Sequence, residues 1–381
     1  MSQKRSIFED VSSDERTAVA TPQPGLIDRA KTGSRRAVQI WLAMLFTLVA
    51  AMILIGGMTR LTDSGLSITE WNVIKGAVPP LNEADWQTEF EKYKQIPQYE
   101  LLNEGMTIEA FKSIYWWEWG HRQLGRFVGL IWALGFFGLL IFRKMPTGWS
   151  NRLLLLGALG GVQGAIGWWM VSSGLTGRMV SVASYRLATH LGLAFLILGL
   201  ITWFMLKLSR SEADLLQARR GREGKLFSMS TGLMHFAALQ ILIGALVAGI
   251  DAGRGYIDWP LMAGSFVPED LFELTPLWTN FFENAGLVQF IHRMVGYLLF
   301  FFGLIVWRRS RQSGNTSTKR AFDWMAVMLF GQIVLGIVTV MHASPWNIAI
   351  LHQAGAIILW VMIIRARFAA QYPVIQKIRR A

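Results

Sequence analysis

The chain contains no cysteine among its 381 residues. This absence excludes disulfide bonds, thiolate-bound metals, iron–sulfur clusters and cysteine catalysis, and it leaves histidine, present six times, as the obvious soft ligand. Charge is also scarce, since 16% of the residues are charged and 52% are hydrophobic. That balance is more apolar than a soluble domain needs, so the composition predicts a polytopic membrane protein.

The first 36 residues lack the apolar core of a signal peptide. They also carry the acids Glu9, Asp10, Asp14 and Glu15, which argue against a mitochondrial transit peptide. We therefore expect a disordered cytoplasmic tail in a bacterial protein.

Eight apolar runs are long enough to cross a bilayer, which takes roughly 20 residues. They lie at 38–58, 121–142, 152–172, 187–207, 229–250, 288–307, 323–342 and 347–365. The net charge of +12 could suggest nucleic acid, but Lys and Arg gather before run 1, between runs 2 and 3, 4 and 5, and 6 and 7, and after run 8. The positive-inside rule then makes both termini cytoplasmic and predicts a bacterial inner-membrane protein without a nucleic-acid partner.

The runs fall into two sets of four, and the fold class is predicted as all-α with two tandemly repeated four-helix bundles. The long outward loop 59–120 is expected to hold two short amphipathic helices, the second of which continues into run 2. The expected parts are a disordered tail (1–36), an N-terminal half (37–210), a cytoplasmic linker (211–228), a C-terminal half (229–366) and a cytoplasmic tail (367–381).

An internal repeat relates the two halves. Four stretches recur in order: "TDSGLSITEW" and "IDAGRGYIDW", "HRQLGRFVGL" and "HRMVGYLLFF", "GVQGAIG" and "FGQIVLG", and "ATHLGLAFLILGL" and "ILHQAGAIILWVM". The last two pairs match Gln163 with Gln332 and His190 with His352. The halves therefore look like one duplicated unit.

Four histidines occupy matched positions at the outer ends of even-numbered spans: His121 and His190 in one half, His292 and His352 in the other. A histidine within a span is costly and usually functional. Two imidazoles at one depth on different helices of a bundle are suited to bind a haem iron from both sides. Zinc or copper would instead require three or four converging ligands, which two symmetric pairs do not supply. Gly125 and Gly296, one turn later, leave space either for a porphyrin or for close helix packing.

The repeat breaks one turn before His121, where Glu118 stands opposite Gln289. Residues at i and i+3 share a helix face, so we expect the Glu118 carboxylate to lie over the same haem plane as His121. Because the twin position keeps the shape but loses the charge, Glu118 is a candidate proton acceptor in a half that performs chemistry. An interfacial glutamate in contact with water is the alternative.

Basic residues near the outer face are candidates for pairing with haem propionates, because guanidinium binds a carboxylate through two parallel hydrogen bonds. They are Arg60, Arg122, Arg126, Arg254 and Arg293. Snorkelling to the interface explains them equally well.

Taken together, these residues resemble the haem A synthase family. The resemblance covers nearly the whole chain after residue 36 and rests on "GGMTRLTDSGLSITEW", "EWGHRQLGR", "ATHLGLAF", "AGIDAGRGYIDWPLM", "QFIHRMVGYLL" and "LHQAG". It implies oxidation of a ring methyl of haem O to a formyl group, through hydroxymethyl haem, to give haem A for terminal oxidases. Many Gram-positive members carry cysteine pairs in outward loops, so this chain is similar to the proteobacterial and mitochondrial branch.

Carried over by position, the resemblance assigns a role to each half. His121 and His190 would flank substrate haem O and product haem A in the N-terminal half, with Glu118 as the acid–base residue, while His292 and His352 would bind one haem b cofactor per chain. Membrane lipid, haem O synthase, cytochrome oxidase assembly factors, an unidentified electron acceptor and a second copy of the chain are the partners it suggests.

Two other classes explain part of the pattern. A diheme b-type electron-transfer cytochrome accounts for four histidines, but it gives no reason for the difference between Glu118 and Gln289. A transporter with repeated halves expects interrupted helices and polar groups at the membrane midplane. The glycine-rich runs "GGVQGAIG" and "GGMTR" hint at interruption only weakly and serve equally for packing.

Overall fold

The structure, a computed structural model, describes residues 26–177 and 179–374. Its eight long helices are α1 (Leu26–Leu61), α4 (Ile108–Ile141), α5 (Ser150–Val171), α6 (Ser184–Leu208), α8 (Gly224–Gly249), α10 (Ala285–Ser310), α11 (Thr316–Met341) and α12 (Trp346–Gln371). All eight have the length and hydropathy to cross a membrane. Among the described residues there is no strand, so the predicted all-α membrane fold is confirmed.

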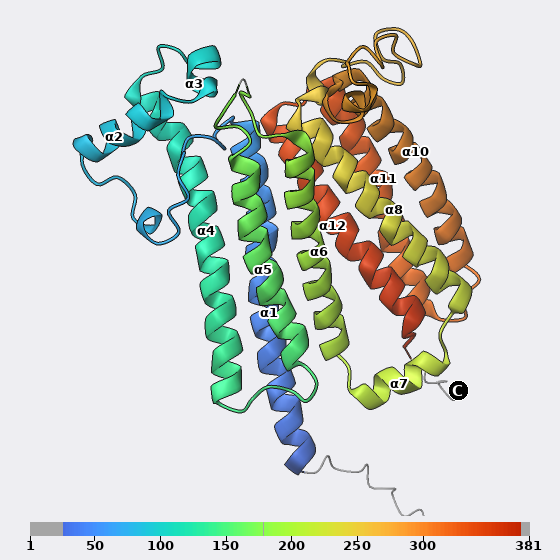
Figure 1. Ribbon diagram of the computed structural model, residues 1–381. Helices are drawn as coiled ribbons and strands as arrows, with labels where there is room; N and C mark the ends of the chain where they lie inside the picture. Colours follow the sequence, from blue (N-terminus) through green and yellow to red (C-terminus); the bar gives the residue numbers. More distant parts are fainter. Residues whose placement is uncertain (1–25, 178, 375–381) are drawn as a thin grey trace, which may run out of the picture.

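The eight helices form two rings of four (Figure 1). In the first ring, α1 and α5 each pack against both α4 and α6; in the second, α8 and α11 each pack against both α10 and α12. The rings join where α6 meets α8 and α12 and where α1 meets α12. α4 therefore lies diagonally across its ring from α6, as α10 does from α12.

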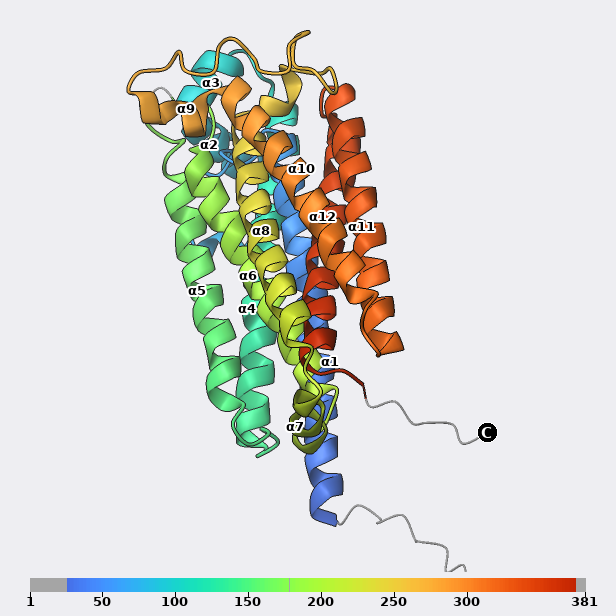
Figure 2. The ribbon, with the colours of Figure 1, turned by 90° about the vertical axis from the view of Figure 1, so that its right-hand side faces the viewer.

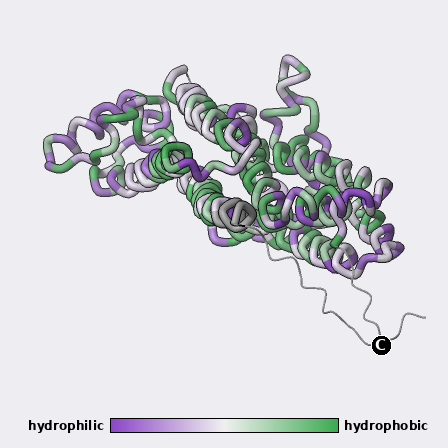
Figure 3. Tube along the Cα trace, turned by 90° about the horizontal axis from the view of Figure 1, so that it is seen from below, coloured by the Kyte–Doolittle hydropathy of each residue, from purple (hydrophilic) through white to green (hydrophobic). Residues whose placement is uncertain are grey.

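Both described ends of the chain lie at one end of the helices, the terminal end (Figures 1 and 2). The segments 62–107 and 250–284 lie at the other, which we call the loop end. Helix α7 (Glu212–Arg220) joins the two halves at the terminal end and starts with a reciprocal Ser211–Asp214 capping box. The view along the helices shows hydrophobic residues along much of the helical trace (Figure 3), as expected of helices that cross a bilayer.

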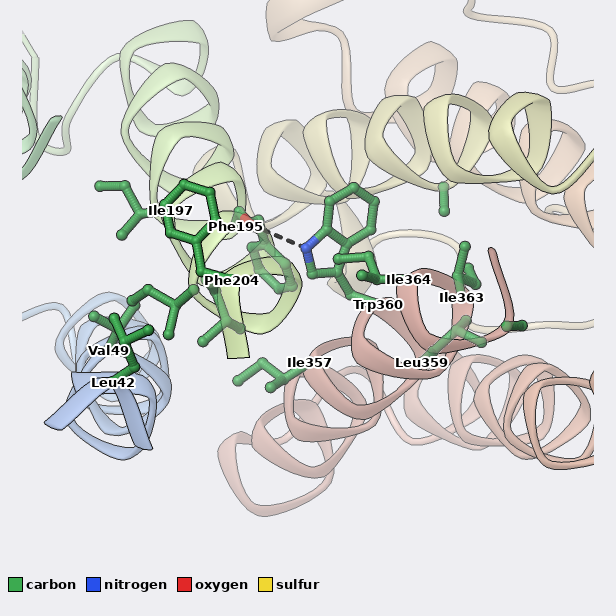
Figure 4. Packing of buried hydrophobic residues seen from close by; sticks show 14 of the residues in the cluster. Leu42, Val49, Phe195, Ile197, Phe204, Ile357, Leu359, Trp360, Ile363 and Ile364 are labelled. Carbon is green, nitrogen blue, oxygen red and sulfur yellow. Dashed lines mark hydrogen bonds between the residues drawn. The ribbon is translucent and has the colours of Figure 1, made fainter. Parts of the chain in front are cut away.

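Packing between the halves uses small residues and one buried indole. Trp360 of α12 donates a hydrogen bond from Nε1 to the Phe195 carbonyl of α6 at 3.0 Å (Figure 4). A Cβ atom on Gly199 would lie only 2.9 Å from that nitrogen, so the glycine permits the close approach. In lipid, where burial of apolar surface gives no net gain, such fit and hydrogen bonding hold helices together.

The loop end of the first half carries a small folded layer. Helix α2 (Glu83–Tyr93), capped by Asn82, and the short α3 (Pro97–Leu102) pack aromatic side chains onto the start of α4. Trp86 makes an edge contact with Tyr115, and Phe90 stacks on Phe111. The two amphipathic helices predicted in this loop are present, and the second continues into the membrane span within α4.

Some predicted boundaries differ from the structure. Residues 26–36, expected in the tail, belong to α1, because the apolar helix continues through its basic approach; residues 1–25 lie outside the described part. The expected linker 211–228 contains α7 and the first turn of α8, and α12 runs five residues into the expected tail, to Gln371. In each case a helix extends past its apolar run into polar residues.

Candidate functional site

The four predicted haem ligands lie near the loop end of their helices. His121 lies on α4 and His190 on α6, the diagonal helices of the first ring, and His292 lies on α10 and His352 on α12, the diagonal helices of the second. Diagonal helices thus supply one imidazole each, the arrangement needed to hold a flat group between them.

Each imidazole rests against a glycine on a neighbouring helix. A Cβ atom built on the glycine would lie within 3.1 Å of the ring Cε1 in all four cases: 2.9 Å for Gly56 and His121, 2.9 Å for Gly167 and His190, 3.0 Å for Gly244 and His292, and 3.1 Å for Gly336 and His352. Contacts this short exclude any residue larger than glycine at these positions unless the imidazole moves. The repeat therefore extends to the way each ligand is seated.

Three of the four histidines also contact a glutamine four residues before that glycine. The Nε2 atoms of Gln163, Gln240 and Gln332 donate to the backbone oxygens of His190, His292 and His352 at 3.0, 3.0 and 2.8 Å. They lie 3.2, 3.1 and 3.3 Å from the corresponding Nδ1 atoms. The Oε1 atoms of all three glutamines are buried and have no hydrogen-bond partner.

His121 is the exception. The position that corresponds to Gln240 holds Met52, in "MILIG" at 52–56 against "QILIG" at 240–244, and His121 Nδ1 is buried without a hydrogen-bond partner. Sequence comparison of the two halves paired Gln163 with Gln332 but missed Gln240. Comparing α8 with α11 within the second half would have found it, because "QILIG" and "QIVLG" share the Gln-x-x-x-Gly spacing.

Glu118 is the only acidic residue among the buried side chains of the described chain, with 2% of its surface exposed. Its Oε2 accepts hydrogen bonds from Ser67 Oγ and the Ile68 amide, both at 2.8 Å, and its Oε1 accepts from Arg122 Nη2 at 2.6 Å. All of these groups donate to the carboxylate. Glu118 therefore connects the start of α4, one turn before His121, to the chain that leaves α1.

Arg122 and Arg293 play matched roles in the two halves. Arg122 donates to the carbonyls of Ile68 and Glu70 at 2.7 and 2.8 Å. Arg293 donates to the carbonyls of Tyr256 and Asp258, which occupy the same repeat positions, both at 2.9 Å. Both guanidinium groups thus tie down the segment after the first helix of their half.

Gln289 replaces the carboxylate in the second half. It is as buried as Glu118, its Nε2 donates to the Tyr256 carbonyl at 3.0 Å, and its Oε1 has no partner. Nearby, the amides of Gly264 and Ala263 donate to Asp258 and hold the pKa of that carboxyl below its usual value. The buried ion pair beside the ligand is therefore present only in the first half.

The other three arginines that are candidates for binding haem propionates form hydrogen bonds or ion pairs within the protein. Arg60 bridges Asp63 at 2.7 Å and Asp251 at 2.5 Å, which are repeat mates from different halves. Arg126 donates to the carbonyls of residues 72 and 73 and to the side chain of residue 123. Arg254, half exposed, contacts Asp251 at 3.5 Å and retains the most freedom to meet a propionate.

Gly125 lies against α1 and Gly296 against α8. A Cβ atom on Gly125 would meet Met52 Cε at 3.6 Å, and one on Gly296 would meet Gln240 Nε2 at 3.1 Å. Of the two explanations left open by the sequence, these contacts favour close helix packing. These glycines admit the side chains that stand beside His121 and His292.

The geometry fits one haem within each ring of four helices. Paired imidazoles project from diagonal helices, and the seats beneath them have no room for a Cβ atom. Three of the four also have a polar neighbour of the kind that orients a metal-bound imidazole. We conclude that His121 with His190, and His292 with His352, have the chemistry to bind two haem irons.

Comparison with known proteins gives a consistent result. The family model described as "Cytochrome oxidase assembly protein" matches residues 39–364. The chain is 65% identical to the heme A synthase of Dinoroseobacter shibae over 382 residues and 64% identical to that of Ruegeria pomeroyi over 381, with all of each chain covered. It is 59% identical to the heme A synthase of Paracoccus denitrificans over 370 residues, with 97% of each chain covered.

Proposed function

Because the chain belongs to the cytochrome oxidase assembly family that includes the haem A synthases, we infer that it is a membrane oxidoreductase that converts haem O into haem A. With water as the oxygen donor, the ring methyl group becomes a hydroxymethyl group and then a formyl group, and each step releases two electrons and two protons. The identity of 55–65% to haem A synthases along the whole chain carries this conclusion. The product serves the assembly of terminal oxidases.

For the division of labour we propose that the first half holds the substrate. His121 and His190 would bind the iron of haem O, and His292 and His352 would bind haem b, which would supply one-electron transfer. A difference in buried charge between the two sites supports this assignment, since Glu118 lies beside one and neutral Gln289 beside the other.

Glu118 is proposed as the proton acceptor. It is buried and lies one helical turn from His121, so it can receive protons released as the methyl carbon is oxidised. Ser67 and Arg122 hold the carboxylate in place. Positioning by fixed groups is what a general base needs if it is to act without reorganisation.

Haem O is amphipathic, and the first ring offers it a route from lipid. α4 is the least buried of the eight spans, with 6% of its apolar window buried inside the protein. On the adjacent α5, a Cβ atom on Gly160, Gly161 or Gly164 would meet no atom within 4 Å. This bare surface is suited to the long apolar tail of the substrate.

We further propose a bacterial inner-membrane location with both termini in the cytoplasm and the haem sites near the periplasmic face. Lys and Arg in the connections at the terminal end support this orientation. A haem O synthase on the supply side and oxidase assembly factors on the product side are the proposed partners. An electron acceptor must also dock, because the reaction releases electrons.

Haem extraction from protein purified from cells that make haem O tests the function. Chromatography and mass spectrometry should find haem b together with haem O, hydroxymethyl haem or haem A. Two haem b per chain, with no other haem despite available haem O, would contradict the synthase function and favour the diheme electron-transfer alternative.

A further inference from the structure

The seats of the four histidines share a glycine, but the residue four positions before it is glutamine in three seats and Met52 in the fourth, the seat of the proposed substrate ligand His121. His190, His292 and His352 each lie beside a glutamine amide. His121 lies beside none, because Met52 occupies the equivalent position and a thioether cannot donate a hydrogen bond. The helix segments are otherwise alike, "MILIG" against "QILIG".

A neighbouring amide matters once an imidazole binds iron. Binding through Nε2 leaves the proton on Nδ1, which then needs an acceptor. Each glutamine has a buried Oε1 atom without a partner on the amide whose Nε2 lies 3.1–3.3 Å from Nδ1. Rotation of the amide by half a turn would bring this oxygen to Nδ1, in exchange for the hydrogen bond that Nε2 now donates to the histidine backbone oxygen. The unpartnered oxygen can then accept the Nδ1 proton of an imidazole whose Nε2 binds iron.

We propose that Gln163, Gln240 and Gln332 are positioning residues that strengthen the bonds of three histidines to haem iron. His121, which has Met52 in place of a glutamine, is then the weakest of the four iron ligands. This inference rests on the proposed assignment of the first half to the substrate. Loss of such a partner typically lowers metal affinity about 10- to 100-fold. Haem b is then held by two firm ligands, and the substrate by one firm and one weak ligand.

The arrangement suits the two haems. A cofactor must stay bound through many turnovers, whereas haem O must enter and haem A must leave. One firm ligand, His190, keeps the iron in register. The weak ligand, His121, lies beside Glu118 on α4, the span most exposed to lipid, so release there opens the site toward the membrane.

A reciprocal exchange of the two residues tests the inference. Met52→Gln gives His121 the missing partner, Gln240→Met removes it from His292, and Met52→Leu is the matched control that changes shape without adding an amide. The holoproteins are purified from cells that make haem O and mixed with excess apomyoglobin, which captures released haem. Extraction identifies which haem has moved.

We expect Met52→Gln to slow release of haem O and haem A by about tenfold, and Gln240→Met to speed release of haem b by about the same factor. A hydrogen-bonded imidazole is also the stronger electron donor, so Met52→Gln should lower the midpoint potential of the first-half haem and shift its low-spin ferric electron paramagnetic resonance signal. Met52→Leu should change neither signal.

Release rates within about twofold of the parent protein for either exchange would overturn the inference, as would a Met52→Leu effect equal to that of Met52→Gln. The proposed function fails separately, if haem b alone is recovered from every protein. In that case the positioning role is still decided by whether the two exchanges change haem release in opposite directions.

Discussion

Glu118→Gln separates the proton-accepting role of this residue from its structural role. The substitution installs the side chain that the second half carries at the matched position, with almost no change in volume. The remaining oxygen can still accept hydrogen bonds from Ser67 and the Ile68 amide. The charge, the proton-accepting capacity and the ion pair with Arg122 are lost.

The two roles predict effects of different size on different measurements. A hydrogen bond to a charged group contributes about 1.5–3 kcal/mol. Arg122 is 18% exposed and keeps two carbonyl acceptors. We therefore expect the substitution to weaken the attachment of segment 62–107 by about 2 kcal/mol. That cost raises the open population of segment 62–107 about 30-fold, which is measurable by limited proteolysis. Loss of a general base instead lowers the rate about 10²- to 10⁴-fold.

We therefore expect Glu118→Gln to reduce haem A formed per bound haem O by about 100-fold or more, with haem content close to that of the parent protein. Ser67→Ala is the control, since it removes one donor to the carboxylate and keeps the charge; it should loosen the loop and leave the rate within about fivefold. If Glu118→Gln retained a third or more of the parent rate, as a rough threshold, Glu118 would be an anchor for the loop and not the proton acceptor.

Three further predictions follow from the described contacts. Gly56→Ala should displace the His121 ring, because the new Cβ would lie 2.9 Å from Cε1; extraction should show loss of haem O and haem A with haem b retained, and equal loss of all haems would indicate general misfolding instead. Asp251→Asn should weaken the Arg60 bridge between the halves by about 1 kcal/mol, since the aspartate is partly exposed; an unchanged melting temperature in detergent would show that the bridge contributes nothing. Because the chain has no cysteine, Ala84→Cys provides a unique label site on α2, and a membrane-impermeant maleimide should modify it in spheroplasts; labelling only after lysis would reverse the proposed orientation.

The membrane fold could be predicted because its main determinants are visible in the sequence. Span length and hydropathy are set by the bilayer, and the eight predicted runs each fall in one long helix. Helix ends were less predictable. α1 and α12 continue into polar residues, where the helix no longer requires an apolar sequence. The short α3 lacks a periodic pattern long enough to detect.

The histidine pairs could be singled out for a different reason: duplication makes the positions of a shared site recur. His121 and His292, and His190 and His352, were recognisable without knowing which helices touch. The carboxylate partners of Arg60 were not, because Asp63 and Asp251 meet at this arginine only through packing of the two halves. Likewise, helical spacing placed Glu118 on the His121 face but could not show that residues 67 and 68 fold back onto its carboxylate.

Two departures from symmetry concern the same histidine, His121. Glu118 stands one turn before His121 where the twin has Gln289, and Met52 stands beside its ring where the twin has Gln240. One change adds a buried charge, and the other removes a hydrogen-bonding amide. A duplicated unit that simply carried electrons would have no reason to alter one ligand twice and leave the seats of the other three alike. Specialisation confined to the surroundings of His121 is instead what a substrate site requires, where iron must be released and protons must be accepted at the same edge of the haem.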